Sequence, residues 1–169
     1  MRTTTSNLFD KAYSRFAVGA FNVFTMEQVL GLFKGADKCG APIIVAITPV
    51  ARKYAQPAML HAMVGAAAEL YPNVVYAVHL DHGNVEHCRD SIQSGCYTSV
   101  MIDASHEPFE QNIEITANIV ERAHAAGMNV EAELGVLSGV EDDLSVDDKD
   151  ALFTSPRQAK EFVATTGCD

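Results

Sequence analysis

Five short runs of β-branched and apolar residues recur along the chain of 169 residues. Runs of this kind, bounded by turn-forming residues, predict strands. Their starts lie 26, 31, 25 and 30 residues apart, which leaves room for one helix per interval, as a parallel β/α repeat requires. The predicted strands are Ala17–Val23, Ile43–Ile47, Val74–Leu80, Ser99–Asp103 and Asn129–Gly135.

The intervals between these runs carry helix start and stop signals. Thr25-Met-Glu-Gln28 is a capping-box motif that opens a helix expected to end near Gly40. Ser155-Pro-Arg-Gln158 repeats the motif, with Gly167 as the stop. The segment Val136–Thr154 has weak periodicity and many acids, so we expect a long loop there. Further helices are predicted at Pro57–Leu70, Val85–Ser94 and Phe109–Ala126.

The alternation of strands and helices predicts an α/β fold with a parallel sheet. A doubly wound sheet would carry a GxGxxG motif after its first strand, whereas Asn22-Val-Phe-Thr25 stands there. A TIM (β/α)8 barrel places its functional residues at the carboxyl ends of several strands. We therefore predict a single barrel domain, residues 1–169, that contains about the first five β/α units.

A polar side chain stands at the end of every predicted strand. One such residue alone is more often a helix cap or part of a solvated turn. Five coincident strand ends favour the rim of an active site instead. These residues are Asn22, Thr48, the His79–Gly83 segment, Asp103, and Glu131 with Glu133.

The third strand ends in the sequence His79-Leu-Asp81-His82-Gly83. With a period of two, His79 and Asp81 point to one side and His82 turns to the other. Neutral imidazole is a common metal ligand, and a neighbouring carboxylate can act as an acid or base. For His79 the alternative is a hydrogen-bonded core residue. The motif is incomplete by itself, because a zinc site needs at least three protein ligands.

Glu131 and Glu133 lie two residues apart, so the strand pattern puts them on one face. Two carboxylates on one face repel unless a cation or hydrogen-bond donors compensate. This predicts a metal or substrate hydroxyls nearby, with a solvated pair at the rim as the alternative.

Composition excludes several functions. A net charge of −10 gives no electrostatic basis for binding nucleic acid or an anionic membrane. No apolar run approaches the roughly 20 residues that span a bilayer. The four cysteines form no CxxC pair, which is typical of reduced cysteines in a cytoplasmic protein.

Three motifs together resemble the class II aldolases of fructose- and tagatose-bisphosphate. They are VHLDHG (Val78–Gly83), SVMIDASHEPFEQNI (Ser99–Ile113) and VEAELGVLSGVEDDLS (Val130–Ser145). AFN (Ala20–Asn22) and LFTSPRQAKEFVATTG (Leu152–Gly167) are also similar to that family.

The resemblance implies a TIM barrel and reversible cleavage of a ketose 1,6-bisphosphate to dihydroxyacetone phosphate and glyceraldehyde 3-phosphate. Zn²⁺ or another divalent metal is the implied cofactor, with a monovalent cation as an additional candidate. The phosphorylated ketose is the implied partner, and a homodimer or homotetramer is the expected assembly. The matched positions are His82 as a metal ligand, Asp103 and Glu133 as carboxylates near the metal, Asp81 as the acid/base at the C4 hydroxyl, Glu141 in a mobile loop as the proton acceptor, and Asn22 and Thr48 near the substrate.

Cleavage of a carbon–carbon bond leaves an enediolate that a metal or a lysine Schiff base must stabilise. None of the six lysines ends a predicted strand, so metal chemistry is favoured over an imine.

Two features depart from the family. The family's other two ligand histidines and its phosphate loops normally lie beyond the position of Asp169, which indicates a C-terminally truncated barrel. Thr48-Pro49 resembles the tagatose branch, so the sugar stereochemistry stays open. Two alternatives to an aldolase also remain: another phosphosugar TIM-barrel enzyme, such as an epimerase or isomerase, and a non-catalytic truncated barrel.

Overall fold

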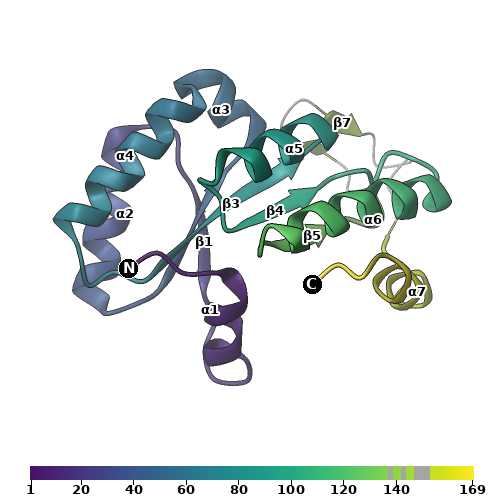
Figure 1. Ribbon diagram of the computed structural model, residues 1–169, viewed down its shortest axis with the longest axis horizontal. Helices are drawn as coiled ribbons and strands as arrows, with labels where there is room; N and C mark the ends of the chain where they lie inside the picture. The colour runs from purple at the N-terminus through teal and green to yellow at the C-terminus, as the bar shows by residue number, and fades with distance from the viewer. Residues whose placement is uncertain (137–138, 142–143, 147–152) are drawn as a thin grey trace.

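Five parallel strands form one sheet, in which each strand lies beside its neighbours in sequence (Figure 1). The computed structural model describes residues 1–136 and 153–169, and the backbone alone of 139–141 and 144–146. All five predicted strands are present, but four of them have different bounds. The first and third begin two residues later than predicted, the third ends three residues later, and the fifth ends at Ala132 rather than at Gly135, so Glu133 follows the strand. The strands are β1 (Gly19–Asn22), β2 (Ile43–Ile47), β3 (Tyr76–Gly83), β4 (Ser99–Ile102) and β5 (Asn129–Ala132).

Helices separate successive strands, and five of them follow the predicted segments. They are α2 (Met26–Cys39), α4 (Pro57–Leu70), α5 (Val85–Ser94), α6 (Phe109–Ala125) and α7 (Pro156–Thr166). The capping box at Thr25 forms, and Gly40 ends α2 in the left-handed conformation. Helix α7 starts where expected. The prediction of a second capping box is wrong, because the Ser155 side chain makes no cap hydrogen bond.

Two short helices were not predicted, α1 (Thr5–Ala12) and α3 (Pro49–Ala55). Each begins at a threonine whose hydroxyl accepts a backbone N–H three residues on, Thr4 for α1 and Thr48 for α3. Both helices are too short for the hydrophobic periodicity that identifies longer ones.

The prediction of a long loop over Val136–Thr154 is wrong for six residues. Strands β6 (Gly139–Glu141) and β7 (Leu144–Val146) pair antiparallel there, with Gly139 opposite Val146. Strands of three residues are too short for alternation to be visible among so many acidic residues.

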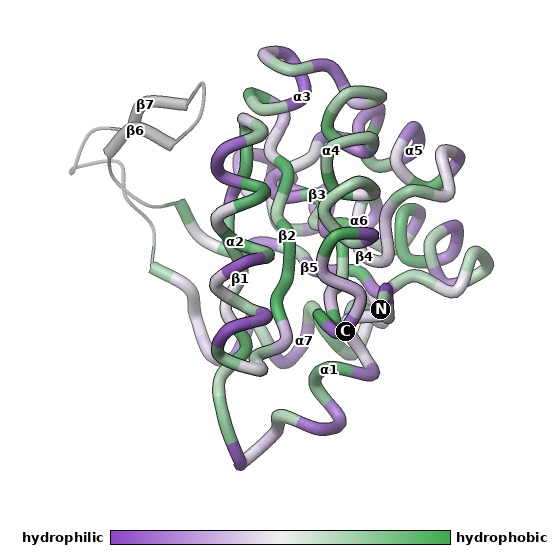
Figure 2. Tube along the Cα trace, turned by 90° about the vertical axis from the view of Figure 1, so that its left-hand side faces the viewer, coloured by the Kyte–Doolittle hydropathy of each residue, from purple (hydrophilic) through white to green (hydrophobic). Residues whose placement is uncertain are grey.

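The sheet has two faces with different partners. Alternate residues of β2 (Ile43, Val45 and Ile47) belong to the main hydrophobic core. Ile44 points the other way and packs with Ala77 and with Leu8 of α1. Figure 2 shows β2 as a continuous hydrophobic stretch, as expected for a strand covered on both faces.

Helix α1 lies beneath the amino-terminal end of the sheet (Figure 1). The hydroxyls of Thr5 and Ser6 both donate to Asn129 Oδ1, at the first residue of β5. With that end covered by a helix, the carboxyl ends of the strands are where a site can form.

A second cluster of polar side chains lies between helices rather than at the strand ends. Arg52 of α3 is 8% exposed and pairs with Asp90 of α5. It also donates to Ser91 Oγ over 2.7 Å and lies 5.8 Å from the centre of the Tyr97 ring. We call these four residues the Arg52 cluster.

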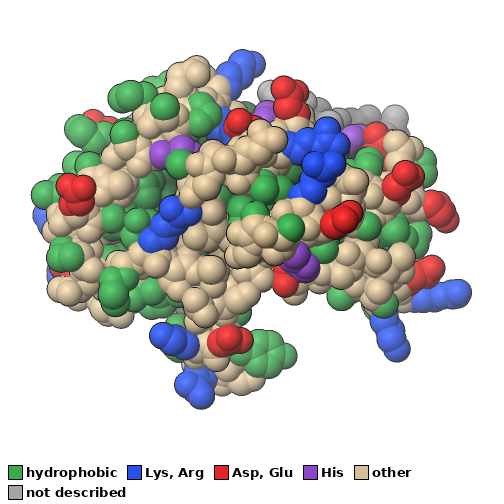
Figure 3. Space-filling view, in the orientation of Figure 1, with side chains coloured by type: hydrophobic (Ala, Val, Ile, Leu, Met, Phe, Trp, Pro, Cys, Tyr) green, Lys and Arg blue, Asp and Glu red, His purple; other side chains and the backbone are tan. Residues whose placement is uncertain are grey.

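The surface carries basic and acidic side chains interspersed over the face seen in Figure 3. The four cysteines, all among the described residues, are unbridged. In the described part of the chain, no helix combines the length and the hydropathy needed to cross a membrane.

Candidate active site

The end of β3 carries an irregularity that turns two side chains toward one pocket. The pairing of β3 with β4 shifts register between Leu80 and Gly83. His82 lies in the left-handed region at φ 49°, a conformation that costs a non-glycine residue about 1–3 kcal/mol. Asp81 and His82 therefore line the same pocket, and the prediction that His82 turns to the opposite side is wrong.

Gly83 is required by the close approach of β3 to its surroundings. A Cβ there would lie 2.4 Å from Leu80 Cδ2 and 3.2 Å from the Met101 carbonyl oxygen. The missing side chain lets Gly83 accept the backbone N–H of Asp103 (2.9 Å). This hydrogen bond brings the start of the loop after β4 beside His82.

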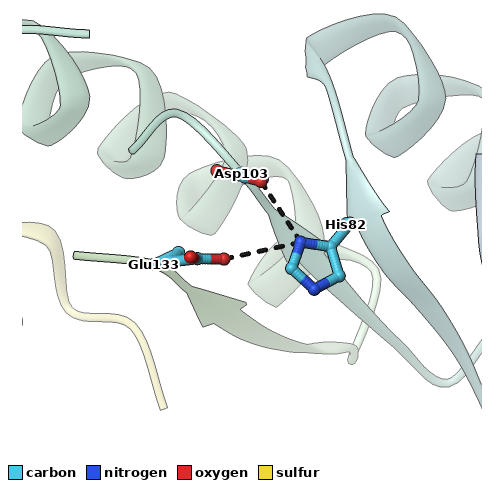
Figure 4. A group of neighbouring side chains, drawn as sticks. All are labelled: His82, Asp103 and Glu133. Carbon is cyan, nitrogen blue, oxygen red and sulfur yellow. Dashed lines mark hydrogen bonds and ion pairs between the residues drawn. The ribbon is translucent and has the colours of Figure 1, made fainter. Parts of the chain in front are cut away.

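Two carboxylates contact one nitrogen of the His82 ring (Figure 4). His82 Nδ1 lies 3.2 Å from Asp103 Oδ2 and 3.4 Å from Glu133 Oε2. The three residues come from the ends of β3, β4 and β5 and are partly buried. Among the described residues, they are the one group of three or more His, Cys, Asp or Glu side chains arranged to hold a metal.

Asp103 is held in its charged form. Its hydrogen bond with His82 and those from the Ser105 hydroxyl and backbone N–H outweigh the cost of burial and lower its pKa to about 2. Asp103 is therefore a carboxylate at any pH near neutrality.

Glu133 is positioned by a buried side chain that the sequence reading missed. Asn112 of α6, 2% exposed, donates from Nδ2 to the Glu133 carbonyl oxygen (2.9 Å) and accepts from Thr116. The sequence does contain a signal for this contact: Asn112 and Thr116 are polar residues within the otherwise apolar stripe of α6, and buried polar groups need hydrogen-bond partners.

Asp81 is fixed by the end of β1. Asn22 Nδ2 donates to Asp81 Oδ2 (2.8 Å), while Asp81 Oδ1 lies 3.9 Å from His82 Nε2. Asp81, His82, Glu131 and Glu133 line a pocket of about 500 Å³. The sequence thus predicted correctly that these strand ends converge.

Two predicted site residues stand apart from this group. The Thr48 hydroxyl caps α3 by accepting the Ala51 N–H (3.2 Å), and its predicted contact with substrate stays a prediction. Glu141 belongs to β6, but its side chain lies outside the described residues, so its role as proton acceptor also stays a prediction.

The sequence of nearly the whole chain, residues 3–169, matches the family model "Fructose-bisphosphate aldolase class-II". The chain belongs to the class II fructose-bisphosphate aldolase family. Two curated aldolases are each 43% identical over 155 residues, or 91% of this chain. One is a fructose-bisphosphate aldolase from Helicobacter pylori, and the other is a D-tagatose-1,6-bisphosphate aldolase subunit from Klebsiella oxytoca.

Solved structures give the same assignment for the fold. A putative fructose-1,6-bisphosphate aldolase from Coccidioides immitis superposes with a TM-score of 0.85 at 29% identity, over 98% of this chain and 58% of that one. The five-stranded sheet is therefore part of an aldolase TIM barrel, as predicted. The chain spans about half the length of the curated relatives, 50% of the H. pylori aldolase and 54% of the Klebsiella subunit.

The residues present fit the metal on which this aldolase family generally depends. Asp81, Asp103 and Glu133 surround one imidazole, so negative charge is in excess. Ligands at about 2.1 Å in a tetrahedral site lie roughly 3.4 Å apart, close to the observed separations from His82 Nδ1. The other ring nitrogen points away from Asp103 and Glu133 (Figure 4) and is a second position at which His82 could bind a metal.

Proposed function

We propose that this chain carries part of the active site of a class II aldolase that cleaves a ketose 1,6-bisphosphate reversibly. The products would be dihydroxyacetone phosphate and glyceraldehyde 3-phosphate. One observation supports this most strongly: Asp81 and His82 face Asp103 and Glu133 at the carboxyl end of the sheet, in a chain of the aldolase family.

In this proposal His82 binds the metal through Nε2. Asp103 accepts the Nδ1–H of His82, and Glu133 lies 3.4 Å from the same nitrogen, which fixes the ring orientation and makes Nε2 a stronger ligand. Donation of the other ring N–H to a carboxylate is the usual arrangement for metal-binding histidines. The bound metal would act as a Lewis acid on the enediolate oxygens.

Asp81 is proposed to exchange a proton with the C4 hydroxyl as the C3–C4 bond breaks. Asn22 holds one carboxylate oxygen by a hydrogen bond (2.8 Å) and so fixes the orientation of the group. A general base needs such fixed geometry before its basicity matters. Glu141 is proposed to exchange the second proton, at the enediolate carbon.

We propose zinc as the metal, because neutral imidazole is a common ligand of Zn²⁺. The unbridged cysteines fit a reducing compartment, and we propose the cytoplasm and a homo-oligomeric assembly. The names of the two curated relatives give different sugars, and both relatives have the same sequence identity to this chain, 43%. Both fructose and tagatose 1,6-bisphosphate are therefore substrates to test.

The test is a coupled triose-phosphate assay on the full-length product of the gene. We expect triose phosphate release from one of the two bisphosphates, loss of release after chelation, and recovery on addition of Zn²⁺. Release that survives complete metal removal would contradict the class II assignment. Interconversion of ketose phosphates without triose phosphate would favour an epimerase or isomerase instead.

A further inference from the structure

Three polar side chains lie in a row across the face of the sheet that points away from the main core. They are His79 of β3, Ser99 of β4 and Glu131 of β5. His79 and Ser99 are direct register partners, and Glu131 pairs with Met101, two residues beyond Ser99. His79 Nδ1 lies 2.8 Å from Ser99 Oγ, and His79 Nε2 lies 3.5 Å from Glu131 Oε2.

The partners of the His79 ring determine its tautomer. Burial lowers the pKa of His79 to about 4, so the ring carries one proton at neutral pH. A carboxylate can only accept, so the nearby Glu131 favours the proton on Nε2, the nitrogen that faces it. Nδ1 then accepts the Ser99 hydroxyl proton, and this assignment is the one that satisfies both contacts.

Glu131 reaches from this row into the active-site pocket. It lines the pocket together with Asp81 and His82. Glu131 shares this pocket with the Asp81 carboxylate, and 64% of its side chain is accessible. An exposed carboxylate that another carboxylate repels needs a donor to keep one orientation, and His79 Nε2 is placed to supply it.

We propose that His79, held in its Nε2–H tautomer by Ser99, is a positioning residue that fixes the Glu131 carboxylate beside Asp81. The Coulomb interaction between two charges depends on their separation. Fixing Glu131 therefore fixes the electrostatic field at the group proposed to transfer the proton. The effect on turnover rests on the proposed function, whereas the tautomer does not.

The first test measures the tautomer directly, by ¹⁵N NMR of the histidine-labelled, full-length protein. His79→Gln removes one set of ring signals and so assigns them. We expect a protonated Nε2 and an unprotonated Nδ1 at pH 7, and a mixture of tautomers in Ser99→Ala. A protonated Nδ1, or a Ser99→Ala spectrum identical to the wild type, would overturn the proposal. This result is independent of whether the protein cleaves any sugar.

The second test compares two substitutions of His79 that differ in reach. The amide nitrogen of Gln can approach the position of Nε2 and donate to Glu131, whereas the shorter Asn side chain cannot. We expect kcat to fall about 10–100-fold in His79→Asn and to be largely restored in His79→Gln. KM should stay within about threefold of the wild-type value in both variants, because the side chain at position 79 is proposed to position Glu131 and not to bind substrate.

A matched control is His124→Gln, which alters a partly exposed histidine at the end of α6. Equal losses in His79→Asn and His79→Gln with equal melting temperatures, or a change in KM alone, would contradict the positioning role. If neither His79 variant folds, Ser99→Ala decides, because it should lower kcat together with the tautomer preference. Absence of wild-type turnover would reject the proposed function and leave the NMR result standing.

Discussion

The two polar clusters of this protein differ in how their charges are balanced. In the Arg52 cluster one guanidinium meets one carboxylate, and the remaining partners, Ser91 and Tyr97, are neutral. At the ends of β3, β4 and β5, three carboxylates surround one imidazole beside a pocket. A balanced cluster is complete within the protein, whereas a surplus of one sign calls for a ligand of the other.

Backbone geometry separates the clusters in the same way. Arg52 projects from the regular helix α3. His82 instead lies at a register shift, with a positive φ that is uncommon for residues other than glycine. Strain of this kind persists where the surrounding structure enforces it, and it concentrates at functional sites. The Arg52 cluster should therefore affect stability, and the His82 group should affect chemistry.

The largest expected effect separates the clusters by activity. Asp81→Ala should lower kcat by about 10²–10⁴-fold, because a general acid/base is removed, while bound metal per protein stays unchanged. Asp90→Ala is the matched control in the Arg52 cluster and should leave kcat of the folded protein unchanged. The measurements are the triose-phosphate assay and metal analysis. Near-wild-type cleavage by Asp81→Ala would remove Asp81 from its proposed role.

The next largest effect is on the stability of the fold rather than on activity. Arg52→Ala should lower the free energy of unfolding by about 2 kcal/mol, because it removes a buried side chain and leaves Ser91 and Tyr97 without their donor, while the exposed Asp90 stays solvated. Urea denaturation followed by circular dichroism measures the loss. A cost below about 1 kcal/mol would mean that this cluster is not structural.

The pH dependence of stability should report the buried His79. Its pKa is about 4 in the folded state and near 6.5 when unfolded. Between these values the unfolded chain binds more protons, so stability is lost as the pH falls from 6.5 toward 4. The loss attributable to His79 between pH 7 and pH 4.5 is about 2 kcal/mol.

His79→Gln should remove this contribution. Urea denaturation at pH 7, 5.5 and 4.5 should therefore show a shallower decline in the variant than in the wild type. His61 and His87, whose pKa values burial also lowers, contribute equally to both proteins and cancel in the comparison. Parallel declines would show that His79 is not held neutral in the fold.

A smaller effect is expected from the carboxylates that hold the His82 ring. Asp103→Asn should weaken metal affinity about 10–100-fold without abolishing it, because it changes a group that orients the ligand. The control is Ser91→Ala, which removes a hydroxyl of the Arg52 cluster and should leave the metal affinity unchanged. Competition with a chromophoric chelator measures both. Complete loss of binding in Asp103→Asn would instead make Asp103 a direct ligand of the metal.

The sequence predicted the elements whose signals are local. The β-branched runs marked all five strands, and Thr25 with Gly40 marked both ends of α2. The register shift at His82 was not predictable, because it depends on the contact of Gly83 with Leu80 and the Met101 carbonyl across the sheet. The alternation of side chains along a regular strand therefore predicted the wrong side for His82.

The candidate site shows the same division. The polar residues at the strand ends were evident in the sequence, since each interrupts an apolar run. Their partners were not: Ser99 binds His79 and Asn112 binds the Glu133 carbonyl only because neighbouring elements place them there. Thr48 was assigned to the rim, although its hydroxyl caps α3, because a cap and a rim residue share one sequence signal.

The central claim is that His82 and its carboxylates form a metal centre, and zinc titration of the full-length protein tests it most directly. His82→Gln should weaken zinc binding on the order of 100-fold or more, since it removes a ligand. His124→Gln, the control histidine of α6, should bind zinc as the wild type does. Unchanged binding in His82→Gln would contradict the account.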